Sequence, residues 1–371
     1  MELNNLMPEC EYEHLGRTLY KSIERAYSVV DDLKGKCEVC EFDIKHHLKP
    51  SSNLSSKIVQ YINSKMIFKY SICFQYKNVN FAVNIFKMDY ETIENYIEEI
   101  KIAVITSLSE KPPFEDEITT EINIFLTELP KHLDVNDSAG SRKNSTSRIT
   151  LDNITSSYST FDECINICVY RSEEWFKTLI SELFLSFTIN LMSSEINFNN
   201  ILSTTFVNVN ANFSIAEPII EFWARIYNVA FFTYHSSETL DEYIGFFQKN
   251  LEDERKFSAM QSTKLLSHFG IKYSATLNSK LSNIKKKYNE NTNAFGLYVM
   301  TSIMFYHFDR IVQWFDNTNN FFDVNKNERQ LVVCAHYLSH GARDSELIEF
   351  FDSISDTENN NTSLRMSLFE V

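Results

Sequence analysis

Residues that break regular structure are scarce in this sequence, which has 7 glycines and 6 prolines among 371 residues. Beside 30 phenylalanines and 18 tyrosines, this scarcity favours long helices and strands with few tight turns. The chain also lacks a Walker phosphate loop, a G-x-G-x-x-G turn, a G-x-S-x-G nucleophile elbow and the protein-kinase motifs. These absences argue against an enzyme that binds nucleotides through a glycine-rich loop.

Long apolar runs and a secretory leader are missing as well. No stretch approaches the roughly 18 apolar residues of a membrane-spanning helix. Segment 1–14 has neither the basic start nor the apolar stretch of a signal peptide. The 7 cysteines are spread along the chain in an odd number, which suits free thiols in a reducing compartment. We therefore expect an intracellular protein that is not secreted and has no membrane span.

Basic residues are also scarce relative to acidic residues. The chain has 35 Lys+Arg against 50 Asp+Glu, a formal net charge of −15. Because affinity for phosphates depends on clustered cations, we expect no nucleic-acid partner. The 43% of apolar residues, with 14% aromatic residues, indicate a globular protein with a sizeable core.

The first half of the chain predicts both strands and helices. Alternating β-branched and aromatic residues mark the strands, and spacings of three and four apolar residues mark the helices. The expected elements are a helix over 12–35, a β-hairpin over 65–87 with its turn at 77–80, a helix over 90–109, and strands over 121–129 and 164–170. Together they predict a small mixed or antiparallel sheet in the N-terminal half.

The second half predicts helices almost throughout. Helices are expected near 196–206, 217–235, 238–250, 254–269, 278–288, 293–317 and 326–341. The chain is thus predicted to be an α+β protein with four parts. They are an N-terminal α+β region (1–133), a flexible polar loop rich in Ser, Asn and Thr (134–160), a helical region (161–343) and an acidic flexible tail (344–371).

The stretch 171–190 has the clearest helical pattern and follows strand 164–170 directly. Ser172, Glu173 and Glu174 offer a cap and first-turn acids. Its large apolar residues recur at helical spacing: Trp175, Phe176, Leu179, Ile180, Leu183, Phe184 and Phe187. A buried helix is expected here.

Within this helix, Ser181, Glu182 and Leu185 occupy the positions that His, Glu and His take in an H-E-x-x-H zinc helix. That spacing puts two ligands one turn apart on one face, beside a general base. The surrounding segment 167–184, ICVYRSEEWFKTLISELF, resembles a stretch in a family of uncharacterised proteins of large DNA viruses (giant viruses). EPIIEFWARIYN (217–228) and ERKFSAMQSTKLL (254–266) are similar to further stretches of that family, so the resemblance extends over roughly residues 120–275.

The resemblance implies a zincin-like fold, that of HExxH metallopeptidases, with strand 164–170 at the sheet edge beside helix 171–190. It implies that Glu182 descends from a general base. Glu217, with Glu221 one turn later, has the spacing of a third ligand on a second helix and should lie near Ser181. Ser181 is a poor ligand and Leu185 has no donor atom, so the metal site is expected to be degenerate and without a cofactor.

Two alternatives remain open. An active metal-dependent hydrolase could use a rearranged site of Glu182, Glu217, Glu221 and a histidine, although such oxygen ligands favour hard cations over zinc. A virion scaffold unrelated to zincins is the other, in which Glu182 would be a satisfied core group paired with Lys177, Arg225 or a backbone donor.

Two other patterns are candidate metal sites. Cys37 and Cys40 form a C-x-x-C close to the His46 and His47 pair, but no second C-x-x-C follows at the spacing of a zinc ribbon. In segment 336–340, HYLSH places two histidines one turn apart near the end of a helix. Ordinary thiols, and histidines favoured by the helix dipole, are the competing interpretations.

The sequence therefore predicts a catalytically inactive, zincin-like viral protein with a structural or binding role, in the virion or in the host cytoplasm. We expect protein partners, which the loop 134–160 and the tail 344–371 would contact.

Overall fold

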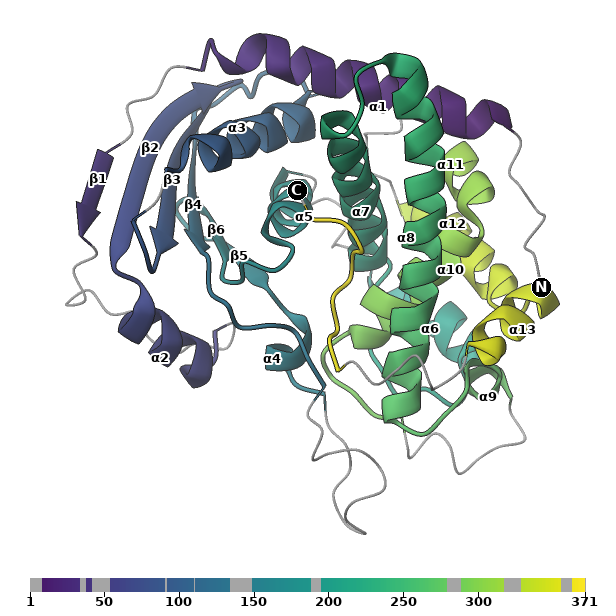
Figure 1. The fold of residues 1–371 in the computed structure, drawn as a ribbon. Coiled ribbons are helices and arrows are strands. Elements are labelled where there is room, and N and C mark those ends of the chain that lie inside the picture. Colours follow the sequence, from purple (N-terminus) through teal and green to yellow (C-terminus); the bar gives the residue numbers. More distant parts are fainter. Residues whose placement is uncertain are drawn as a thin grey trace.

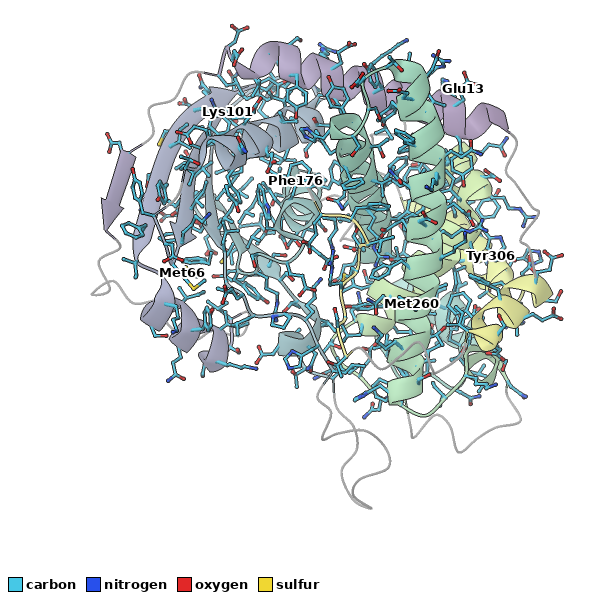
Figure 2. The ribbon with its side chains drawn as sticks, in the orientation of Figure 1. Glu13, Met66, Lys101, Phe176, Met260 and Tyr306 are labelled. Atoms are coloured by element: carbon cyan, nitrogen blue, oxygen red, sulfur yellow. The ribbon has the colours of Figure 1, made fainter. Side chains whose placement is uncertain are left out.

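The computed structural model describes residues 9–33, 38–41, 54–90, 92–109, 111–133, 149–187, 195–278, 288–316, 328–354 and 362–370. Figure 1 shows a β-sheet on one side of the molecule and the later helices on the other, with α5 between them. Figure 2 shows side chains filling this space, with Phe176 of α5 near its centre. The predicted α+β class, with a mixed sheet in the N-terminal half and a helical C-terminal half, is confirmed.

The described strands form one six-stranded sheet in the order β1-β2-β3-β4-β6-β5. The strands are β1 (Glu38–Glu41), β2 (Phe68–Tyr76), β3 (Val79–Lys87), β4 (Ile118–Phe125), β5 (Ser157–Phe161) and β6 (Ile165–Val169). The neighbours β3, β4 and β6 run parallel, whereas β1, β2 and β5 each run antiparallel to the strand beside them on the inner side. β5 is therefore an antiparallel edge strand.

The hairpin between β2 and β3 was predicted, and its turn is shorter than the pattern indicated. Lys77 and Asn78 alone form the turn, with φ values of 51° and 63°, as two-residue hairpin turns with left-handed backbone require. The Lys77 ammonium donates to the carbonyls of Leu108 and Ser109, at 2.7 and 2.6 Å. This contact ties the hairpin to the end of the following helix.

Most of the predicted helices are present. The described helices are α1 (Glu9–Val30), α2 (Ser56–Lys65), α3 (Glu94–Leu108), α4 (Leu151–Ile154), α5 (Trp175–Phe187), α6 (Glu195–Thr205), α7 (Ala216–His235), α8 (Leu240–His268), α9 (Tyr273–Leu277), the π-helix η3 (Phe295–Met300), α10 (Thr301–Tyr306), α11 (Phe308–Asp316), α12 (Glu328–Gly341) and α13 (Ser345–Ser353). The stretch expected at 293–317 is divided into three, α2, α4, α9 and α13 were not predicted, and most of 278–288 lies outside the described residues. The helices expected at 238–250 and 254–269 are one helix, because no glycine or proline interrupts the chain between them. None of the described helices is long and apolar enough to cross a bilayer.

Both faces of the sheet are covered. The main core joins one face to α1, α3, α5 and α7, whereas α2 packs on the other with Ile58 and Ile62 buried against the strands. Phe86 and Phe125 stack there with ring centroids 4.2 Å apart. Since α5 contacts both the sheet and α7, the residues of α5 lie where the two halves of the chain meet.

The predicted polar loop 134–160 is wrong at its C-terminal end, while residues 134–148 lie outside the described residues. α4 and β5 occupy 151–161. The buried guanidinium of Arg171 donates to the carbonyls of Pro130, Asp152 and Thr155, at 2.9, 2.6 and 2.9 Å. Arg171 thus satisfies backbone carbonyls of this polar segment. The segment can therefore be ordered although it contains no long run of apolar residues.

The predicted flexible tail is also wrong where the structure describes it. α13 covers 345–353, and residues 362–370, here called the C-terminal segment, enter the core with Leu364 and Met366 buried. The amide of Leu364 donates to the carbonyl of Lys131, at 2.9 Å. Two buried carboxylates, described below, bind other amides of the segment.

Candidate functional site

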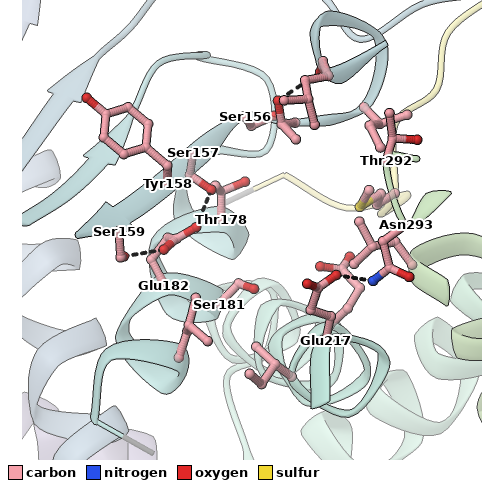
Figure 3. Close-up of a pocket in the computed structure, with 18 of the residues that line it drawn as sticks. Ser156, Ser157, Tyr158, Ser159, Thr178, Ser181, Glu182, Glu217, Thr292 and Asn293 are labelled. Carbon is pink, nitrogen blue, oxygen red and sulfur yellow. Dashed lines mark hydrogen bonds between the residues drawn. The ribbon is translucent and has the colours of Figure 1, made fainter. Parts of the chain in front are cut away.

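One face of α5 lines a cavity of about 460 Å³. The lining residues of this face are Thr178, Ser181, Glu182 and Leu185. Ser181 and Glu182 follow Thr178 by three and four residues and precede Leu185 by four and three, so the four share one side of the helix. Figure 3 shows Ser181 and Glu182 at the cavity with Glu217 on the opposite side. Ser181, Glu182 and Leu185, the positions compared above with H-E-x-x-H, therefore line one cavity.

The other walls come from distant parts of the chain. β5 contributes Ser157 and Ser159, α7 contributes Glu217 and Glu221, and the segment before η3 contributes Asn293. The amide of Asn293 donates to Glu217. All five residues singled out in the sequence, Ser181, Glu182, Leu185, Glu217 and Glu221, thus line the same cavity.

Glu182 is buried and accepts hydrogen bonds from hydroxyl groups. Ser157 Oγ donates to its Oε1 at 2.7 Å, and the hydroxyl of Ser159 donates to its Oε2. Burial raises the pKa of Glu182, and the nearby charge of Glu217 raises it further, although the two hydroxyls act in the opposite direction. If Glu182 were only a core group, Lys177, Arg225 or a backbone donor was expected to pair with it; among the described residues, two serine hydroxyls take that role instead.

Lys177 and Arg225 bind Glu221 instead. Lys177 Nζ lies 2.9 and 3.0 Å from the two carboxylate oxygens, and Arg225 Nε lies 2.8 Å from Oε1. All three side chains are buried. Burial alone would raise the pKa of Glu221, but the two cations lower it below its ordinary value. Glu221 is therefore ionised, and Lys177 and Arg225 balance its charge.

A second buried ion pair borders the cavity, with Lys131 in its lining. Lys131 Nζ lies 2.6 Å from Glu174 Oε2, and both side chains are fully enclosed. The other oxygen of Glu174 accepts the amide hydrogens of Met366 and Ser367, at 2.8 and 2.5 Å. This arrangement brings Met366 to the cavity wall.

The donor atoms present do not fit a zinc ion. A catalytic zinc needs three protein ligands and one open position. Ser181 offers only a neutral hydroxyl, Leu185 has no donor atom, and the carboxylate of Glu221 is bound by two cations. Among the described residues, no three His, Cys, Asp or Glu side chains converge as metal ligands would.

No family model, curated protein or solved structure matches this chain. The interpretation of the cavity therefore depends on the chemistry of its own residues and on the resemblance seen in the sequence.

The strand beside α5 differs from the prediction. Strand 164–170, expected at the sheet edge, corresponds to β6 and is paired on both sides, with β4 and β5. The edge position belongs to β5, which supplies both serines that bind Glu182. Segment 157–161, SYSTF, is short and polar and does not alternate cleanly, so there was little signal for a strand in the sequence.

The other candidate metal sites lie elsewhere. His336 and His340 are exposed on α12 and do not line the cavity. Cys37, His46 and His47 fall outside the described residues, as does the side chain of Cys40.

Proposed function

We propose that this chain is a catalytically inactive, zincin-like protein whose cavity binds an extended segment of a protein partner. The resemblance to proteins of large DNA viruses suggests a structural or binding role in the virion or in an assembly in the host cytoplasm. The observation that carries the proposal is the meeting of Ser181, Glu182 and Leu185 with Glu217 in one cavity, beside an antiparallel edge strand.

The edge of β5 supports binding of an extended chain. The amide of Tyr170 donates to the carbonyl of Ser156 at 2.8 Å, which makes these two residues a hydrogen-bonded antiparallel pair. Because such pairs alternate along a ladder, Ser157, Ser159 and Phe161 direct their backbone groups away from β6. No other described strand pairs with that side of β5, so an extended peptide could add there as a further strand.

Loss of the histidine positions argues for binding without zinc-dependent hydrolysis. We expect protein purified without chelators to contain well below one zinc per chain, and its zinc content not to change in the Glu182→Gln variant. Elemental analysis measures this, and a peptidase assay with added zinc accompanies it. Stoichiometric zinc that is lost in Glu182→Gln, together with peptide hydrolysis, would establish the rearranged hydrolase instead.

Edge pairing is tested at Phe161, which is 43% exposed and whose amide points outward by the same alternation. We expect Phe161→Pro to weaken binding of unstructured peptides by about 3- to 10-fold, the range for one lost hydrogen bond. Fluorescence anisotropy with a labelled peptide pool measures the affinity. The matched control Phe161→Ala keeps the amide, so equal losses in both variants would place the peptide elsewhere.

A further inference from the structure

The lysines that line the cavity are already paired with carboxylates of the protein. The charged side chains that line it are Lys131, Lys177, Glu182, Glu217 and Glu221. Lys131 is paired with Glu174 at 2.6 Å, and Lys177 is paired with Glu221 at 2.9 Å. A charged ligand that enters therefore meets lysines whose charge is balanced within the protein.

Glu182 differs from these pairs. It is only 8% exposed and binds two hydroxyl groups, and no lysine or arginine among the described residues lies within ion-pair distance of it. Glu217 adds a second carboxylate to the same cavity. A cation that enters a partly buried site of this kind is attracted to carboxylates more strongly than at the surface, because screening by water and salt is weaker there.

Two buried hydroxyl groups of the lining point to a ligand independently of the carboxylates. Thr178 and Ser156 are 4% and 5% exposed, and neither hydroxyl oxygen has a hydrogen-bond partner within the described protein. Both residues line the cavity, and Figure 3 shows them on two of its walls. Buried polar atoms are normally satisfied, so each of these oxygens lacks a hydrogen bond that a bound group would supply.

The remaining lining is apolar. Ile154, Leu185, Ile220, Leu297 and Met366 contribute to the wall. A ligand group with an aliphatic stem and a charged end fits this combination, because the stem packs on apolar side chains while the end is solvated by oxygens.

From these observations we infer that the cavity receives a cationic side chain, lysine or arginine, from the extended segment bound at β5. Its ammonium or guanidinium group binds the Glu182 carboxylate and the hydroxyls of Thr178 and Ser156. The inference rests on the proposed function and adds the chemistry of the ligand to it.

The test compares labelled, end-blocked peptides that differ at one central residue: lysine, arginine, norleucine or glutamate. We expect the lysine and arginine peptides to bind the full chain about 10- to 100-fold more tightly than the norleucine peptide, the range for a hydrogen bond to a charged group. The glutamate peptide should bind most weakly. Binding of free butylammonium is measured in parallel. This control distinguishes a site for the cationic side chain of a peptide from a site for any small amine.

Three variants identify the group responsible. Glu182→Gln should reduce the preference for lysine over norleucine to near unity, and Glu217→Gln should reduce it in the same direction. Glu349→Gln, an exposed glutamate of α13, removes the same charge away from the cavity and should leave the preference unchanged. Circular dichroism confirms that each variant is folded.

The outcomes separate this inference from the proposed function. Peptide binding without a preference for cations overturns the inference and leaves the proposed function standing. Absence of binding by every peptide contradicts the proposed function itself. Tight butylammonium binding without any gain from the peptide, or stoichiometric calcium that Glu182→Gln removes, would overturn the inference in favour of a small amine or a divalent cation.

Discussion

The Glu174→Gln variant is expected to lose about 3 to 5 kcal/mol of unfolding free energy, the usual cost of removing one partner from a buried ion pair. Lys131 would remain enclosed without a counter-charge. The amides of Met366 and Ser367 would also exchange a charged acceptor for a neutral one. Equilibrium denaturation followed by circular dichroism measures the change.

The charge state of Glu174 supports this expectation. Burial alone would raise its pKa, but Lys131, Lys177 and the bound amides lower it to about 2. Its contribution to stability is therefore present above the unfolded-state pKa near 4.5 and is lost as the pH falls toward 2. Its backbone has a φ of 59°, a left-handed conformation that these contacts maintain against its intrinsic cost.

The double variant Lys131→Met, Glu174→Gln provides the control. It removes both charges, so the loss should be clearly smaller than in Glu174→Gln alone. If the single and double variants lose equal stability, the unpaired charge of Lys131 is not the cause, and the bonds to the C-terminal segment account for the effect.

The predictable part of this site is the part that local periodicity determines. Ser181, Glu182 and Leu185 share a face of α5 because a helix repeats every 3.6 residues, and Glu217 and Glu221 share a face of α7 for the same reason. The pairing of Glu221 with Arg225 at 2.8 Å is likewise an i, i+4 contact. It was available from the sequence, although Arg225 was considered there as a partner of Glu182.

Long-range contacts determine the part that was missed. β5 is polar and short, and it is ordered by pairing with β6 and by the bonds of Arg171 to nearby carbonyls. The C-terminal segment is ordered by Glu174, which precedes Met366 by 192 positions. Contacts between residues so far apart in the chain leave no periodic pattern in the sequence. Composition alone therefore indicated a loop and a tail.

The ion pair of Lys131 and Glu174, which helps to order the C-terminal segment, also shapes the cavity. The carbonyl of Glu174 accepts from the amide of Thr178 in the first turn of α5, and its side chain positions Met366 at the cavity wall. Lys131, the partner of Glu174, lines the cavity as well. The shape of the cavity therefore depends on the C-terminal segment being in place, which makes the ion pairs that bind it relevant to ligand binding.

Glu254 is expected to make the stability of this region depend on pH near neutrality. Its Oε2 accepts from the Leu368 amide at 2.8 Å and from the Ser367 hydroxyl at 3.2 Å, while Arg225 Nη1 is 3.9 Å from its Oε1. Burial raises the pKa of Glu254 to about 7, because the distant arginine and the two donors offset burial only partly, and Glu174 opposes ionisation further.

The sign follows from the protons bound in each state. Between pH 4.5 and 7 the folded chain retains a proton that the unfolded chain releases, so the unfolding free energy falls as the pH rises through this window and is level above it. The effect of this one group is about 3 kcal/mol at most. Glu254→Gln cannot ionise, so the difference in unfolding free energy between it and the unsubstituted protein should shift in favour of the variant by that amount from pH 4.5 to 7.5.

Denaturation of both proteins at a series of pH values measures this difference, which cancels the titration of the other carboxyl groups. Glu252→Gln is the matched control, since Glu252 lies on the same helix with its side chain 31% exposed and pairs with Arg255 at 3.2 Å. The difference in unfolding free energy between Glu252→Gln and the unsubstituted protein should be nearly constant from pH 4.5 to 7.5. If the unfolding free energy of Glu254→Gln also differs from that of the unsubstituted protein by a constant amount, then Glu254 is ionised in the folded chain throughout this pH range. Arg225 would then compensate fully for its burial.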